Sequence, residues 1–233
     1  MQNINSHIVN CLESPASLFK GLSQKEKESI VQHHTVATVK KGGYLYREGD
    51  KGRGLVYLVS GKAKVCRTGV AGREHIIKML KEQDLTGFQN LFTETMWSAS
   101  AIATEECVIL TLEKQNLLRI LRSNPEIGVK ICIALSEELS YSYDKMVSLT
   151  QKHVRGRLVE SLLMLAGIYG FEADGKTIKA CLSRSDLAHL SNMTTSNAIR
   201  TLSNLVTEGN IKIKGRKITL LNTANLERIS DQA

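Results

Sequence analysis

A stretch near the end of the chain, LSNMTTSNAIRTLSNL, gathers side chains that suit contacts with phosphates and base edges. The helix predicted there opens with four short polar residues: Thr194, Thr195, Ser196 and Asn197. Thr194 is the expected N-cap, since its hydroxyl can accept a hydrogen bond from a backbone N–H group of the first turn. Short polar groups at a helix N-terminus approach anions closely, and Arg200 can pair with guanine through two hydrogen bonds. These residue types favour a surface that contacts nucleic acid.

The two faces of this helix differ in character. Four apolar residues at helical spacing should pack inward: Ala198, Leu202, Leu205 and Val206. The opposite face carries one cation among short polar side chains: Ser196, Asn197, Arg200, Ser203 and Asn204. A helix that is only solvated and well capped would more often use Glu, Lys and Gln, which are better helix formers. That alternative stays open on the helix alone, and its surroundings favour the nucleic-acid interpretation.

Positive charge surrounds the same helix. Between residues 179 and 220 two acids, Asp186 and Glu208, stand against seven cations: Lys179, Arg184, Arg200, Lys212, Lys214, Arg216 and Lys217. Such a local excess is typical of a DNA-binding face, and the last three cations, at a predicted hairpin tip, suit phosphate contacts. A solubilising hairpin is the alternative. The formal net charge of +8 also favours a polyanionic partner, although it is weak evidence alone.

No pattern in the sequence indicates catalysis or a metal site. We find no nucleophile–base arrangement, phosphate loop or metal-ligand spacing. The cysteines are scattered: Cys11, Cys66, Cys107, Cys132 and Cys181. An odd, dispersed set without an export signal predicts reduced thiols. No run approaches the roughly 18 apolar residues that a membrane span needs. We therefore expect a cytoplasmic protein that is not an enzyme and has no membrane partner.

The first half of the chain predicts a β-rich domain. The segment SQKEKESIV opens with a capping box, Ser23 with Glu26, and indicates a short helix. From Thr35 onward, short β-type runs alternate with glycines, which is typical of a β-sandwich or small barrel. The segment TGFQNLF interrupts these strands and should be helical or turn-like.

A long helix is predicted from Pro125 to about Val154, because the chain has no further proline there and no glycine after Gly128. Six residues recur at alternating steps of three and four: Cys132, Leu135, Leu139, Ser142, Met146 and Leu149. This a/d stripe indicates a seam between two copies of the helix. Docking of the helix on the β-domain of its own chain is the alternative.

The last third alternates helices with β-structure. An amphipathic helix should end at Gly170, and ADGKTIKACL indicates a strand entered by an Asp-Gly turn. Ser183 with Asp186 caps a short helix, the TTSN helix follows and should stop at Gly209, and NIKIKGRKITLL predicts a β-hairpin. This order indicates a winged helix-turn-helix. We expect an α+β chain with a β-domain over residues 1–124, a dimerisation helix over 125–153 and a DNA-binding domain over 154–233.

From about Leu18 to Leu221 the chain resembles the cyclic-AMP receptor protein / fumarate-and-nitrate regulator (Crp/Fnr) superfamily of bacterial transcription factors. The resemblance rests on GGYLYREGD…GLVYLVSGKAKV, on VRGRLVESLLMLA and on LSRSDLAHLSNMTTSNAIRTLSNLVTEGNIKIKGRKITL. It implies a cyclic-nucleotide-binding-type β-roll (a double-stranded β-helix), a long dimerisation helix and a C-terminal winged helix-turn-helix. It also implies a homodimer, a near-palindromic double-stranded DNA site and RNA polymerase as a partner.

The resemblance places the DNA-reading positions on Thr195, Ser196 and Arg200. The arginine matches the family pattern. The second position is often glutamate in the family, and cyclic-AMP-responsive members have arginine at the first. We therefore expect a half-site unlike the best-known consensus, with Asn197 as a further reader, because asparagine can pair with adenine through two hydrogen bonds.

The effector cassette departs further from the family. Cyclic-AMP-binding members carry Gly-Glu-x-x-Leu and an Arg-Ser pair where this chain has Gly87, Phe88, Gln89, Asn90 and Leu91, then Trp97 and Ser98. Loss of the cation removes a charge-assisted phosphate contact worth about 1.5–3 kcal/mol. Ser142 and Tyr143 take the positions that face the base, and the tyrosine is bulkier than the usual small hydroxyl residue. Cyclic AMP is therefore not the expected effector.

No cofactor is predicted. An iron–sulfur sensor needs a cluster of N-terminal cysteines, and Cys11 stands alone. A haem sensor would need an axial ligand, and no spacing singles one out among its candidates: His33, His34, His75, His153 and Cys66. The alternative function is a ligand- or haem-sensing regulator that acts through a protein or RNA partner rather than DNA.

Overall fold

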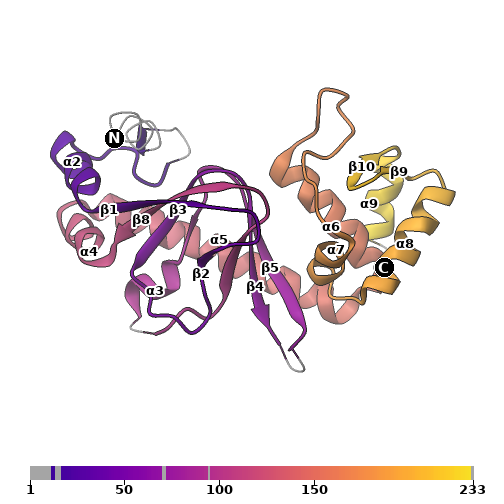
Figure 1. Cartoon of the computed structure of the whole chain (residues 1–233), viewed down its shortest axis with the longest axis horizontal. Helices are drawn as coiled ribbons and strands as arrows, with labels where there is room; N and C mark the ends of the chain where they lie inside the picture. Colours follow the sequence, from indigo (N-terminus) through magenta and orange to yellow (C-terminus); the bar gives the residue numbers. More distant parts are fainter. Residues whose placement is uncertain (1–11, 14–16, 70–71, 94, 232–233) are drawn as a thin grey trace. The chain divides into compact units, whose positions relative to one another are not determined.

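The computed structural model of the 233-residue chain describes residues 12–13, 17–69, 72–93 and 95–231. The chain divides into two compact units, one of residues 1–67 and 80–140 and the other of residues 68–79 and 141–233. Figure 1 follows the chain through both units.

Two four-stranded sheets, ordered β1-β8-β3-β6 and β2-β7-β4-β5, form the predicted β-roll. Their strands are β1 (His34–Val39), β2 (Tyr44–Tyr46), β3 (Gly54–Ser60), β4 (Ala63–Thr68), β5 (Glu74–Leu80), β6 (Leu85–Thr86), β7 (Ser100–Ala103) and β8 (Cys107–Glu113). The antiparallel β1–β8 register runs from His34 opposite Leu112 to Val39 opposite Cys107. Strand β3, which lies inside the first sheet, is buried over residues 54–58.

The roll is accompanied by helices α2 (Gln24–Gln32), α3 (Phe88–Phe92) and α4 (Lys114–Ser123). The capping box predicted for α2 is present, with the Ser23 hydroxyl accepting from Glu26 N and the Glu26 carboxylate accepting from Ser23 N. Within TGFQNLF, the residues Phe88–Phe92 form α3, which confirms the predicted helical interruption. The apolar core beneath these helices includes Phe88, Leu91 and the start of the next helix at Ile127 and Ile131.

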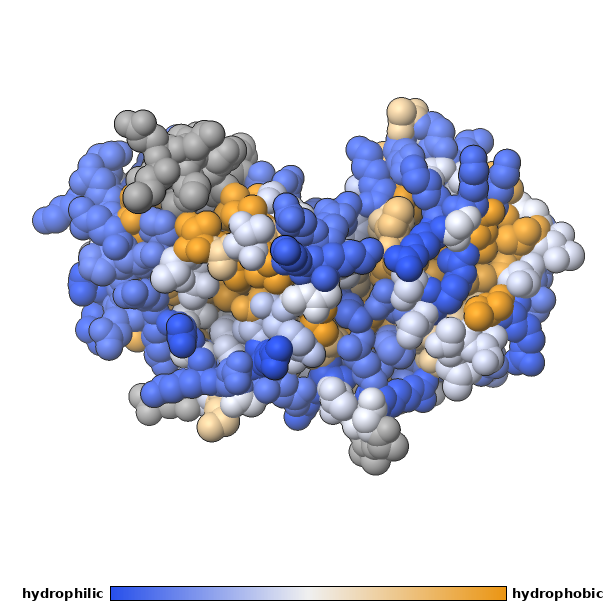
Figure 2. All heavy atoms as spheres, in the orientation of Figure 1, coloured by the Kyte–Doolittle hydropathy of each residue, from blue (hydrophilic) through white to orange (hydrophobic). Residues whose placement is uncertain are grey.

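The long helix α5 (Pro125–Gln151) lies where the sequence predicts it. It is followed by α6 (Val154–Tyr169), α7 (Arg184–Leu190), α8 (Thr195–Thr207), the hairpin β9 (Ile211–Lys214) and β10 (Lys217–Leu220), and α9 (Thr223–Asp231). This order confirms the α+β class and the winged helix-turn-helix. In the residues that the structure describes, no helix is long and apolar enough to cross a membrane. The face in Figure 2 is largely hydrophilic, with apolar side chains in separate patches.

One predicted strand is not formed. The segment ADGKTIKACL makes only isolated bridges, from Ile178 to Phe171 and from Thr177 to Thr219. The Asp174 carboxylate accepts from Lys176 N at 3.0 Å and Thr177 N at 2.8 Å, and these local bonds curl the backbone away from an extended course. The Thr177 hydroxyl also donates to the Asp174 carboxylate, and this bond, followed by the two backbone bonds, lowers the pKa of Asp174 to about 2.

Candidate nucleic-acid interface and effector site

Helix α8 begins as the sequence predicts. Thr194 is its N-cap, and the Thr194 hydroxyl accepts from Asn197 N at 3.2 Å. The inward face consists of Ala198, Thr201, Leu202 and Leu205. Val206, which we expected there, is 42% exposed. It lies eight residues after Ala198, a step that rotates it by about 80° toward the edge of the buried face, and Thr201 takes the place instead.

The outward face of α8 holds the predicted readers. Thr195, Ser196, Arg200 and Ser203 are exposed, and Asn197 is half-buried. The Nη2 atom of Arg200 donates to Asn197 Oδ1 over 3.1 Å, so one turn of helix holds the guanidinium beside the amide. Because Arg200 is exposed, this hydrogen bond can be exchanged for one to a base edge without burying an unpaired charge.

Arg157 of α6 holds the turn that precedes α8. Its guanidinium donates to Ser191 O at 3.0 Å, to Asn192 O at 3.1 Å and to Lys152 O at 2.9 Å. Asn192 has a φ of +49°, a left-handed conformation that asparagine tolerates better than most residues. One half-buried cation thus ties the end of α7 and the turn to the end of α5, which sets where α8 begins.

A second arginine of α6 fixes the other end of α8. Arg155 makes a bidentate ion pair with Glu208, the C-cap residue, with Nη1 donating to Oε1 at 2.7 Å. This pairing lowers the pKa of Glu208. Gly209 follows at a φ of +72° and ends the helix, as predicted. The sequence predicts only an amphipathic helix here, so the roles of both arginines were missed. The signal was a pair of cations two positions apart in the first turn of α6.

The hairpin tip presents cations in the same domain as α8. Gly215 turns the chain at a φ of +61°, and Arg184 Nη2 donates to Gly215 O at 2.9 Å. Lys214 and Arg216 are exposed. Lys217, also predicted to contact phosphate, forms an ion pair with Glu172 at 2.8 Å, which raises the pKa of Lys217. A phosphate at Lys217 would have to compete with that carboxylate.

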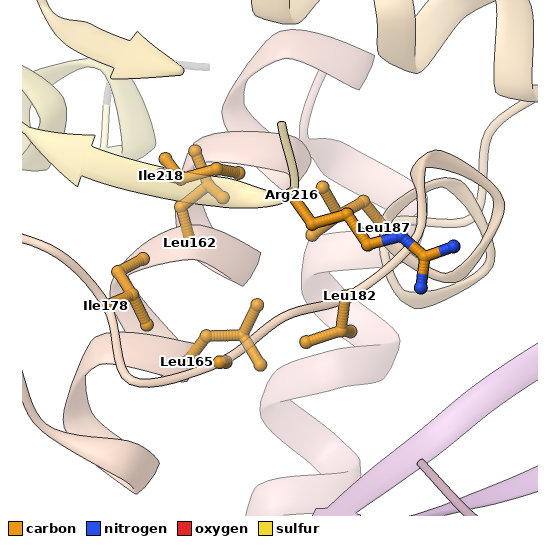
Figure 3. A pocket seen from close by; sticks show the side chains of 8 residues that line it. Leu162, Leu165, Ile178, Leu182, Leu187, Arg216 and Ile218 are labelled. Atoms are coloured by element: carbon orange, nitrogen blue, oxygen red, sulfur yellow. The ribbon is translucent and has the colours of Figure 1, made fainter. Parts of the chain in front are cut away.

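A small apolar hollow lies beneath Arg216 (Figure 3). It is lined by Leu162, Leu165, Ile178, Ala180, Leu182, Leu187, Arg216 and Ile218. Its cavity volume of about 10 Å³ is far below the hundreds of Å³ of a ligand site. The hollow is a gap in the core that joins the hairpin to α6 and α7.

In the β-roll, aromatic residues fill the positions of the predicted effector cassette. Phe88 and Leu91 belong to the buried core. The buried Trp97 ring stacks on Tyr46, with ring centroids 4.0 Å apart and planes 16° apart. The Tyr46 hydroxyl and Thr86 Oγ1 are hydrogen-bonded at 2.7 Å, and burial raises the pKa of Tyr46 to about 12.

The polar members of the cassette bond to one another and to nearby backbone. Asn90 Nδ2 donates to Thr95 O at 2.6 Å, and the Ser98 hydroxyl donates to Gln89 Oε1 at 3.0 Å. Ser142 and Tyr143, on α5, are both exposed. Trp97, directly before Ser98, takes the position at which cyclic-AMP-binding members have arginine, so the side chain at this position is uncharged.

Gly87 is the position where the tryptophan leaves least room, and we predict that Gly87→Ala destabilises the protein. Its φ is +97°, and a Cβ there would lie 2.4 Å from Trp97 Cη2. We expect a loss of roughly 2–4 kcal/mol in the free energy of unfolding, measured by chemical denaturation. Gly42→Ala is the control, because its φ is +81° with nothing near its Cβ. It isolates the backbone cost of about 1 kcal/mol, and equal losses in both variants would contradict the close packing.

Helix α5 exposes most of the residues that the sequence predicts for a dimer seam. Cys132, Leu139, Ser142 and Met146 are exposed, whereas Leu135 packs on the β-roll core and Leu149 is half-buried. The exposed apolar residues of α5 define what we call the α5 stripe: Val129, Ile133, Leu139, Tyr143, Met146 and Val147. At 100° per residue, these six positions share one broad face of the helix.

The described residues contain no group of three or more His, Cys, Asp or Glu side chains that could hold a metal ion. Cys66, Cys107, Cys132 and Cys181 are free thiols. Cys11, the basis for excluding an iron–sulfur cluster, lies outside the described residues.

Comparison with known proteins agrees with this arrangement. A model of the cyclic nucleotide-binding domain matches residues 36–124, and one of the Crp-like helix-turn-helix domain matches residues 156–229. A CRP-like cAMP-activated global transcriptional regulator of Mycobacterium tuberculosis is 22% identical over 91% of this chain and 96% of its own length. The cyclic AMP receptor protein of Thermus thermophilus is 25% identical over the same shares. FixK2 from Bradyrhizobium japonicum has the same fold, with a TM-score of 0.75, 20% identity and coverage of 84% of this chain and 96% of its own.

A nucleotide-binding-type β-roll joined to a winged helix-turn-helix defines a class of DNA-binding transcription regulators, which are not enzymes. The chain belongs to the Crp/Fnr family of that class.

Proposed function

We propose that this protein regulates transcription as a homodimer that reads a near-palindromic DNA site through Arg200, Ser196 and their neighbours on α8. The outward face of α8 carries the proposal. It presents a cation and short hydrogen-bonding groups at a helix N-terminus, held at both ends by arginines of α6. Lys214 and Arg216 supply positive charge for phosphates. RNA polymerase would be the protein partner. Because the proposed DNA site lies on the chromosome, the dimer would act in the cytoplasm.

A selection of bound DNA from random sequence tests the proposal directly. The purified full chain should enrich an inverted repeat whose half-sites differ from the cyclic-AMP-receptor consensus, because Ser196 and Thr195 replace that group's charged readers. Enrichment of no sequence at any salt concentration would contradict it. Recovery of RNA instead, in a parallel selection, would favour the alternative partner.

The effector is proposed to be a molecule other than cyclic AMP. Phe88, where the family has glutamate, has no side-chain group that can bond to a ribose hydroxyl, and Trp97, where it has arginine, offers a phosphate one indole N–H donor but no positive charge. We also propose that no iron–sulfur cluster is present. Haem is the remaining cofactor hypothesis, and an absorption spectrum of the freshly purified protein decides it.

Cyclic AMP and cyclic GMP at millimolar concentration should leave the melting temperature unchanged. A ligand that binds the native state stabilises it by mass action, by about 2.7 kcal/mol at one hundred times its Kd. Differential scanning fluorimetry measures the shift. The variant Trp97→Arg, which has a cation in the cassette, is measured alongside the wild type for comparison. A clear rise of the wild-type melting temperature with either nucleotide would contradict the proposed divergence of the site.

A further inference from the structure

Ile199 is an exposed apolar residue in the middle of the proposed reading face. Its side chain is 48% exposed although it lies in the first half of α8. Ser196 is three residues before it and four before Arg200, so the Ser196 side chain is a neighbour of each of them on the helix surface. Thr195 and Ser203 lie four residues to either side of Ile199 and are also exposed. This position was not among the readers predicted from the sequence.

Helix stability does not account for this residue. Isoleucine is β-branched and lowers helix propensity, whereas the buried face of α8 is already complete without it. A scattered apolar side chain on a surface needs no special cause. Ile199, however, sits among short polar groups at the helix end that enters the major groove in helix-turn-helix proteins.

The major groove offers one apolar group that matches such a side chain. Thymine alone among the bases of DNA presents a C5-methyl group there, and proteins read it by apolar contact. Arg200 lies about 100° around the helix from Ile199. The residues that follow the line of Ile199 along the helix, Thr195 and Ser203, are uncharged, so a methyl group there would desolvate no charge. We propose that Ile199 reads the methyl group of a thymine in each half-site. This inference rests on the proposed function and adds a specificity-determining residue to it.

Val206 supplies a matched comparison. It is the other exposed aliphatic residue of α8, at 42%. Seven residues separate it from Ile199, which is about 10 Å along the axis. Because the N-terminal part of a recognition helix contacts base edges, Val206 should lie beyond the bases.

The test pairs protein variants with methyl-deleted DNA. Each thymine of the selected half-site is replaced in turn, symmetrically, by deoxyuridine, which keeps the base pair and removes only the methyl. At one position, wild-type affinity should fall about fourfold per half-site, or roughly fifteenfold for a two-half-site DNA. Ile199→Ala should bind thymine and deoxyuridine DNA equally there, whereas Val206→Ala should behave as wild type.

Three outcomes would overturn the inference: a selected half-site without thymine, deoxyuridine tolerated at every position by the wild type, or an unchanged thymine preference in Ile199→Ala. If the wild type still prefers its selected site in those cases, the proposed function stands and only the role of Ile199 falls. If the wild type shows no sequence preference at all, the proposed function itself fails. Circular dichroism of Ile199→Ala, expected to match the wild type, separates misfolding from lost recognition.

Discussion

Arg200→Ala should remove most of the preference of the protein for its selected DNA over a scrambled sequence. A bidentate arginine–guanine contact contributes about 1–3 kcal/mol of discrimination, and a palindromic site holds two of them. The expected loss is therefore roughly 2–6 kcal/mol in specific binding, with little change on scrambled DNA. Gel-shift titrations with both DNAs at one fixed salt concentration measure it, since affinities without the salt concentration are uninterpretable.

Two further variants show whether the loss is one of reading or of charge. Lys214→Ala, on the hairpin, should weaken both DNAs alike and reduce the slope of log affinity against log salt by about 1 for each phosphate that is no longer neutralised. Arg228→Ala removes the same charge as Arg200→Ala from an exposed position on α9 and should leave both affinities near the wild-type values. If Arg200→Ala behaved like Arg228→Ala, α8 would not be the reading helix.

The hydrogen bond between Arg200 and Asn197 affects the free energy of DNA binding in two opposite ways. In the free protein the guanidinium already has one acceptor, 3.1 Å away. Binding must exchange that bond for bonds to a base, so the net gain is smaller than the gross strength of the new interaction. In return, the pair limits the rotamers of both side chains, and less conformational entropy is lost when DNA binds.

Local signals allowed much of the DNA-binding domain to be predicted. The caps at Ser183 and Thr194 and the stop at Gly209 are decided by neighbours within four residues, and the structure confirms them. The roles of Arg155 and Arg157 could not be predicted in this way. Their acceptors, Glu208 and Ser191, are more than thirty residues away, and only the packed domain brings them together.

Packing also explains why the apolar spacing misled on α8, and it involves one residue of the predicted α5 seam. Val206 fits the apolar spacing of α8, yet Thr201 is buried in its place because the inward face is rotated toward Thr201 relative to the hydrophobic pattern. On α5, Leu135 fits the a/d pattern but packs on the β-roll core of its own chain. When a helix has apolar residues on two sides, each side can match a heptad pattern. The sequence alone does not say which of the two sides packs on its own chain and which remains exposed.

Ile133→Glu should convert the dimer to a monomer. Ile133 is 54% exposed and lies in the α5 stripe, the broad apolar face that we propose to be the dimer seam. In a two-fold seam each substitution places two carboxylates in apolar surroundings, where their desolvation and mutual repulsion oppose association. Light scattering coupled to size exclusion should report a mass near 25.8 kDa, that of one chain. Affinity for the palindromic site should fall by about 10²–10⁴, because two linked half-site contacts become independent.

The controls separate a lost seam from an altered helix. Ile133→Leu keeps the apolar surface and should remain dimeric. Glu137→Lys changes the charge at an exposed position of the same helix that is not part of the α5 stripe, and it should leave both mass and DNA affinity close to the wild-type values. A dimeric Ile133→Glu protein with unchanged DNA binding would place the seam elsewhere. Monomeric Ile133→Glu that still bound a single half-site weakly would show that α8 reads DNA on its own and that α5 supplies only the pairing of the two readers.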